Sequence, residues 1–191
     1  MSRTVPPDAA PADIMPPYAY EFYRVAVDDA ARSAVSSFLA YGEVVQNEGS
    51  EAEAARLLHD ALTHSAAVSR FFWPPKKSGA LAAYRGEKLR EIYKIDETSA
   101  LFNRDLRNEL EHFDEKLDNW LREIPVGPII ASPIFADHTI VDEGFGHAFK
   151  VVDCNNDIFV ILGRKYDFGK ICREVVSLLS GDDLQNEIGE T

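Results

Sequence analysis

The residues with the clearest chemical potential are Arg107, Asn108 and His112, which lie close together in one charged segment. Arginine is always charged and can hold a phosphate through two parallel hydrogen bonds. Histidine titrates near neutral pH and can exchange protons with a 2′-hydroxyl or a leaving oxygen. Asparagine can orient either partner. These residue types suit cleavage of RNA by attack of its own 2′-hydroxyl, a reaction that requires no metal ion.

The pattern around these residues predicts a long amphipathic helix from about Ser99 to Ile124, which stops before Pro125. Its apolar face comprises Leu106, Leu110, Phe113, Leu117, Trp120, Leu121 and Ile124. Its polar face gathers Arg104, Asn108, Glu111, His112 and Glu115. Arg107 and His112 lie about 140° apart around the axis. A phosphodiester reached by both would therefore cross the polar face or lie between this helix and a neighbour.

The pattern Arg107-Asn108-x3-His112 resembles the Arg-x4–6-His motif of the HEPN superfamily (higher eukaryotes and prokaryotes nucleotide-binding domains). The resemblance covers about residues 18 to 124. It implies a metal-independent endoribonuclease without a cofactor, acting as a homodimer whose two protomers lend Arg and His to one cleft. Arg107 would bind the phosphate, His112 would act in acid–base catalysis and Asn108 would support them. Such proteins are frequent in toxin–antitoxin systems, so the expected partners are RNA and an antitoxin or another protein.

A second hypothesis is a non-catalytic HEPN-like interaction or scaffold module. The spacing of Arg107 with Glu111, and of Asn108 with His112, also suits a solvated helix face with pairs four residues apart. The helix is acidic, which opposes the approach of RNA. The β-containing C-terminal part also lies outside the usual bundle of that superfamily.

Other polar residues are weaker candidates. We expect Arg104 and, from the edge of the second helix, His64 to contact substrate. His59 is expected to face solvent. Arg85 and Arg90 are expected to form surface ion pairs with Glu87 and Glu91. No metal site is expected, because the spacing of His138, His147, Cys154 and Cys172 matches no closed zinc pattern.

The expected fold is mainly α, a four-helix up-and-down bundle with a small C-terminal β-hairpin plus helix. The other helices are predicted from about Tyr18 to Asn47, Ser50 to Phe72 and Tyr84 to Tyr93, and a closing helix from Lys170 to Leu179. Strands are predicted at Ile129–Phe135, Ala148–Asp153 and Ile158–Leu162, the last two as a hairpin. The expected organisation is a flexible Pro-rich arm (1–17), a HEPN-like bundle (18–124), an appendage packed on it (125–180) and an acidic tail (181–191).

Composition limits the function classes. The net charge of −12 argues against broad, non-specific binding of nucleic acid and favours solubility or a basic protein partner. No apolar run approaches the roughly 20 residues that span a bilayer, and the N-terminus has no secretory signal, so no membrane association is expected. Two cysteines are too few for a disulfide framework, which favours a cytoplasmic location.

Overall fold

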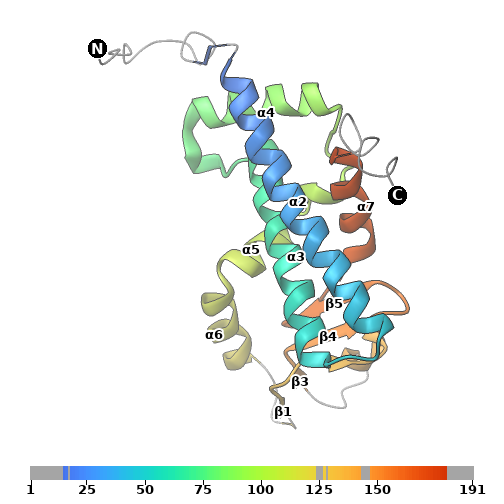
Figure 1. Cartoon of the computed structure of the whole chain (residues 1–191). Coiled ribbons are helices and arrows are strands. Elements are labelled where there is room, and N and C mark those ends of the chain that lie inside the picture. Colours follow the sequence, from blue (N-terminus) through green and yellow to red (C-terminus); the bar gives the residue numbers. More distant parts are fainter. Residues whose placement is uncertain (1–14, 17, 124–126, 128, 143–146, 180–191) are drawn as a thin grey trace.

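The computed structural model describes residues 15–16, 18–123, 127, 129–142 and 147–179. The chain is mainly helical, with short strands and a final helix in its C-terminal part (Figure 1). Two long helices, α2 (Ala19–Gln46) and α3 (Glu51–Phe72), lie side by side and make the largest contact in the fold. Ser50 caps α3 as predicted, because its hydroxyl accepts a hydrogen bond from the Glu53 amide at 3.4 Å.

The third helix approaches the end of α3 closely. It is α4 (Gly79–Tyr93), which follows a short 3-10 turn, η1 (Lys76–Ser78), and begins earlier than predicted. Gly86 makes the approach feasible, since a Cβ there would lie 2.6 Å from the Phe72 carbonyl oxygen and 2.7 Å from Pro74 Cδ. The helix–helix contact therefore depends on a residue without a side chain.

The prediction of one continuous helix from Ser99 to Ile124 was wrong. The segment forms a 3-10 turn η2 (Ala100–Phe102) and two helices, α5 (Arg104–Glu111) and α6 (Phe113–Glu123). The apolar periodicity runs through both helices, but they pack on different neighbours. α5 packs on α3, whereas the Phe113 ring of α6 lies 6.1 Å from the ring of Phe149 beside the sheet. The break at His112 lets the chain pass from one neighbour to the other.

The C-terminal part contains a small sheet in the order β2–β4–β5–β6, formed by Ile134–Phe135, Lys150–Asp153, Ile158–Ile161 and Arg164–Asp167. β2 and β4 run parallel, while β4–β5 and β5–β6 are antiparallel. A separate parallel pair joins β1 (Ile129–Ile130) to β3 (His147–Ala148). The predicted β4–β5 hairpin is confirmed. The first predicted strand is split into β1 and β2, and β6 was not predicted.

One hydrophobic core joins the long helices to the C-terminal elements. Val152 and Phe159 of the sheet, and Ile171 and Val175 of α7 (Phe168–Leu179), belong to the same buried cluster as α2 and α3. α7 packs mainly on α2. Of the predicted arm, the structure describes Met15, which is buried, and Pro16; the rest of residues 1–17 and the tail 181–191 lie outside the described residues.

Candidate functional site

The motif segment begins and ends at well-defined helix caps. Asn103 starts α5, because its Oδ1 accepts hydrogen bonds from the amides of Asp105 at 3.1 Å and Leu106 at 3.0 Å. His112 ends α5 with φ −118° and ψ 38°, outside the helical range. Its amide still donates to the Asn108 carbonyl at 3.1 Å, and its carbonyl accepts from the Lys116 amide at 3.0 Å. A single residue thus forms the junction between α5 and α6.

Arg107 lies inside the protein rather than on its surface. The residue is 5% exposed, and its Nη1 donates a 2.7 Å hydrogen bond to the carbonyl oxygen of Trp73, the C-cap residue of α3. Burial lowers the pKa of the Arg107 guanidinium, while the nearby Glu111 carboxylate opposes that shift. The side chain therefore satisfies an orphan carbonyl at a helix end, and this hydrogen bond holds α5 against α3.

Two arginines of α4 bind the same end of α3. Arg85 Nη2 donates to the Arg70 carbonyl at 3.3 Å, and Arg90 Nη1 donates to the Phe72 carbonyl. The expected ion pairs of Arg85 and Arg90 with Glu87 and Glu91 were therefore wrong; Glu91 pairs with Lys88 instead, at 2.6 Å. Cationic donors suit this position, because the C-terminus of a helix carries partial negative charge. With Arg107, they form a three-arginine cap on α3.

The other two motif residues face solvent. The His112 side chain is 56% exposed, and its Nδ1 lies 4.0 Å from Glu115 Oε2. Asn108 is also exposed. The neighbouring Glu111 Oε1 lies 3.2 Å from Nε of Arg70, whose side chain is 53% exposed. The junction thus presents an imidazole, an amide and a paired guanidinium to solvent, while Arg107 points into the protein.

Glu109, between the motif residues, is a buried anchor that sequence reasoning did not identify. Its side chain is 2% exposed and its Oε1 lies 3.1 Å from Arg164 Nη1 of β6 and 3.8 Å from Lys116 Nζ. Burial, and after it the Glu109 charge, raises the pKa of Tyr166 to about 12. The nearest sequence signal is the position of Glu109, which lies between Leu106 and Leu110 near the apolar face. Glu109 ties α5 to the sheet, as Arg107 ties it to α3.

The two predicted substrate contacts are not brought together. The Arg104 guanidinium lies 5.2 Å from the centre of the Phe102 ring. Arg104 lines an open groove of about 550 Å³ between the start of α5 and α7, with Ser99, Ala100, Phe102, Asn103, Asp105, Asp167, Lys170 and Ile171. His64 is half-buried on α3, and its side chain makes no hydrogen bond or ion pair with another residue that the structure describes.

The expectation that His59 faces solvent was wrong. His59 is half-buried, and its Nδ1 is enclosed with no hydrogen-bond partner among the described residues. Burial lowers the pKa of its imidazole, and the positive charge of Lys150 adds to that shift. The fold therefore partly encloses His59, which helical periodicity within α3 could not reveal.

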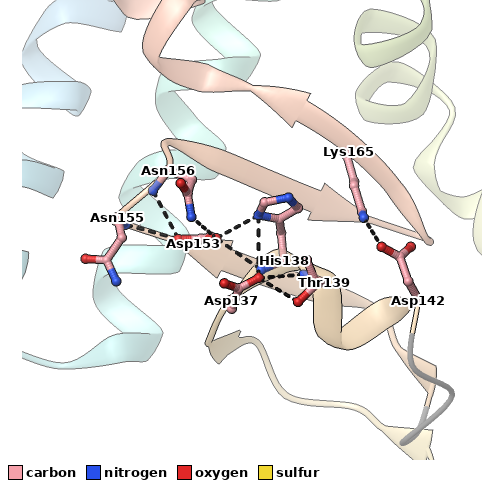
Figure 2. A network of polar contacts seen from close by, with 8 residues as sticks. All are labelled: Asp137, His138, Thr139, Asp142, Asp153, Asn155, Asn156 and Lys165. Carbon is pink, nitrogen blue, oxygen red and sulfur yellow. Dashed lines mark hydrogen bonds and ion pairs between the residues drawn. The ribbon is translucent and has the colours of Figure 1, made fainter.

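A polar network centred on Asp153 joins the turn before β3 to the β4–β5 hairpin (Figure 2). The buried Asp153 Oδ2 lies 2.7 Å from His138 Nδ1 and accepts hydrogen bonds from the His138 amide and Asn156 Nδ2, at 3.1 and 2.9 Å. Its Oδ1 accepts from the amides of Asn155 and Asn156, both at 3.1 Å. Burial alone would raise the pKa of Asp153, but hydrogen bonds from Asn156 and His138 outweigh it and hold that pKa well below its usual range.

This network is the only group of potential metal ligands within the described ranges. One ligand atom each from Asp137, His138 and Asp153 lies within 4.8 Å of the others. Both Asp153 oxygens, however, already accept hydrogen bonds, and Asp137 Oδ1 accepts from the Thr139 amide and hydroxyl, each at 2.8 Å. The donor set therefore serves to clamp η3 (His138–Val141) to the sheet.

The remaining members of the histidine and cysteine set lie in different environments. The Cys154 Sγ accepts a hydrogen bond from the Tyr41 hydroxyl at 3.2 Å, and Cys172 is half-buried on α7. The His147 ring lies 6.5 Å from the Trp120 ring. None of the helices in the described ranges has the length and apolarity that crossing a membrane requires.

The chain matches no protein-family model, no curated protein and no solved structure. The decisive feature of the motif is the opposite placement of its two ionisable side chains, Arg107 inside and His112 outside.

Proposed function

We propose that the protein is a HEPN-like interaction module that binds a partner without cleaving RNA. The observation that carries the proposal is the position of Arg107, 5% exposed and hydrogen-bonded to the Trp73 carbonyl. A catalytic arginine must reach the phosphate that the histidine serves, whereas this one is committed to holding α5 on α3. The module is a four-helix up-and-down bundle of HEPN type, acting in the cytoplasm as a homodimer.

Electrostatics favours the same conclusion. His112 is followed by the exposed acidic residues Asp114 and Glu115, and the whole chain carries a net charge of −12. An RNA phosphodiester approaching the junction would meet these carboxylates, while the exposed Arg70 guanidinium is already paired with Glu111. A protein partner with a basic surface, such as an antitoxin or another protein of a conflict system, suits this charge better.

A metal-independent endoribonuclease is the second candidate, favoured by the exposure of His112 and Asn108 at the α5–α6 junction. In that function His112 would transfer protons, Asn108 would orient the substrate, and the homodimer would supply a second His112 to the composite cleft. Arg70, which is 53% exposed and paired with Glu111, would then leave Glu111 and bind the phosphate. Arg107 would act as a positioning residue, because it fixes the helix that carries the junction.

One experiment separates the two functions. The purified full chain is incubated with mixed RNA in EDTA, beside the His112→Ala and Arg70→Ala variants, and the RNA is resolved by size. The interaction module predicts intact RNA in every sample. Cleavage by the parent, lost in both variants, would overturn it in favour of the nuclease. Asn119→Ala, a substitution at a surface position on α6, is the control for the effect of mutation on folding.

The partner-binding part of the proposal has its own measurement. Light scattering on the purified chain gives its mass in solution, and the homodimer predicts about twice the 21.3 kDa of one chain. If the partner is basic, its association with this acidic chain should weaken as the salt concentration is raised, because salt screens the attraction between their charges. A strictly monomeric chain would contradict the homodimer.

A further inference from the structure

Lys150 occupies a position in the sheet where an apolar residue would be expected. It begins β4 and pairs in register with Ile161 of β5. Side chains alternate across a strand, so Lys150 points to the same face as Val152, which belongs to the core shared with the helices. Lys150 is half-buried there. The chain therefore places an amine at the edge of its core, between the sheet and the helices.

The surroundings of this amine are aromatic. Lys150 Nζ lies 5.3 Å from the centre of the Phe113 ring of α6 and 5.1 Å from that of Phe149. Among the described residues it forms no ion pair with a carboxylate, although the chain has 32 acidic residues. Lys88, Lys165 and Lys170 each have such a partner, in Glu91, Asp142 and Asp167. Lys150 thus differs from these lysines by its apolar enclosure.

Enclosure makes the neutral amine easier to form. Burial lowers the pKa of Lys150, because the charged form loses hydration that no carboxylate of the described residues replaces. The two ring contacts favour the charged form and offset part of this effect. The positive charge of Lys150 also lowers the pKa of His59 on α3, where burial is the larger cause. Both effects favour the neutral imidazole, whose Nδ1 has no hydrogen-bond partner among the described residues.

We propose that Lys150 is an acyl-acceptor site, modified by small acyl phosphates at its half-buried amine beside the Phe113 and Phe149 rings. Lysine is activated as a nucleophile when an apolar site desolvates it. The neutral amine attacks the carbonyl carbon, the N–C bond forms and the C–O bond to phosphate breaks. Inorganic phosphate leaves with the bonding electron pair, and the nitrogen loses one proton to solvent. The product is a neutral amide, which carries no charge to desolvate at this half-buried position.

Acetyl phosphate is the probe that tests this site. The full chain is incubated with it near neutral pH, and acetylation at each lysine is followed with time by peptide mass spectrometry. We expect Lys150 to react several-fold faster than the exposed Lys76 and Lys77. We also expect the pH at which its rate levels off to lie below that of the exposed lysines. In concentrated urea the difference should vanish, because the unfolded chain has no enclosure.

Two outcomes would overturn the proposal. One is a rate at Lys150 in the folded protein equal to or below that of Lys76 and Lys77, which would mean that the rings protect the amine. The other is faster acetylation of Lys150 than of Lys76 and Lys77 even in urea, which would mean that the neighbouring sequence, and not the fold, makes Lys150 reactive. The Lys150→Arg variant keeps a cation but lacks the amine. It should lose the fast phase of total acetyl incorporation and retain the slow phase at exposed lysines.

Discussion

Replacing Arg107 with methionine tests the structural role assigned to this residue. Methionine keeps much of the aliphatic volume but cannot donate to the Trp73 carbonyl, which the Arg107 guanidinium reaches at 2.7 Å. A hydrogen bond to a charged group contributes about 1.5–3 kcal/mol, and relief of the guanidinium's desolvation offsets part of its loss. We therefore expect Arg107→Met to lower the free energy of unfolding by about 1–3 kcal/mol.

The assay is urea unfolding followed by circular dichroism, with thermal unfolding as a second measurement. For a chain of this size, a loss of 1 kcal/mol shifts Tm by roughly 2–4 °C, so Arg107→Met should lower it by about 2–12 °C. The matched control is Arg70→Met, which removes a guanidinium from the same end of α3. Arg70 and Glu111 are 3.2 Å apart but partly exposed, so the control should cost less than about 1 kcal/mol.

The reasoning would be refuted if Arg107→Met unfolded at the same urea concentration as the parent. It would also be refuted if Arg70→Met cost as much, because the effect would then follow the charge of the region rather than the buried hydrogen bond. A change in the dependence of stability on urea would indicate an altered unfolded state, so this slope must match between the proteins compared.

Three further substitutions probe the elements around the motif. Gly86→Ala should destabilise the protein, because the new Cβ would lie 2.6 Å from the Phe72 carbonyl oxygen. Gly42→Ala, whose new Cβ would meet no neighbouring atom within 4 Å, should stabilise α2 by up to about 1 kcal/mol. Urea midpoints of the two variants that move in the same direction would contradict this reasoning. Asp153→Asn removes a carboxylate whose pKa is lowered in the folded state, so the stability it confers is present above its unfolded pKa of about 4 and is lost as pH falls below that value. The gap in urea midpoint between parent and variant should therefore narrow from about pH 6 to about pH 3, and a constant gap would count against the assignment. Asn103→Ala should lower the free energy of unfolding by about 1 kcal/mol, because it removes the N-cap of α5. The control is Asn108→Ala at an exposed position of the same helix, and an equal loss of stability in thermal unfolding of the control would argue against a capping role.

The long helices were predictable because burial imposes a regular period on them. Helical spacing predicts an α3 packing stripe of Ala54, Leu57, Leu58, Ala61, Leu62, Ser65 and Val68, and all of these are buried except Leu57, which is half-buried. In α2 the predicted stripe of Tyr23, Val27, Ala30, Ala34, Ser37, Tyr41 and Val44 is partly confirmed. Val27, Ala34 and Tyr41 are buried, and so are Ala31 and Phe38, which the prediction did not include. The β4–β5 hairpin followed from a turn sequence between two apolar runs. Each of these elements is specified by residues near to one another in the chain.

Features that depend on distant partners were not predictable from local patterns. The apolar spacing continues across His112, so periodicity could not locate the break; a capping preference at Asn103 was the available sign that a new helix starts there. Arg107 seemed solvent-exposed because an arginine is polar, and only the end of α3 explains its burial. Likewise, β6 is rich in charge and became recognisable as a strand only through its pairing with β5.

The three-arginine cap also bears on how the protein opens. A helix terminus ordinarily frays ahead of the rest of the molecule. Here the last carbonyls of α3 are held by Arg85 and Arg90 of α4 and by Arg107 of α5. Opening that turn requires the release of both helices, so the Trp73 amide, which donates to Ser69 at 2.8 Å, should exchange with solvent deuterium only in concert with the detachment of α4 and α5.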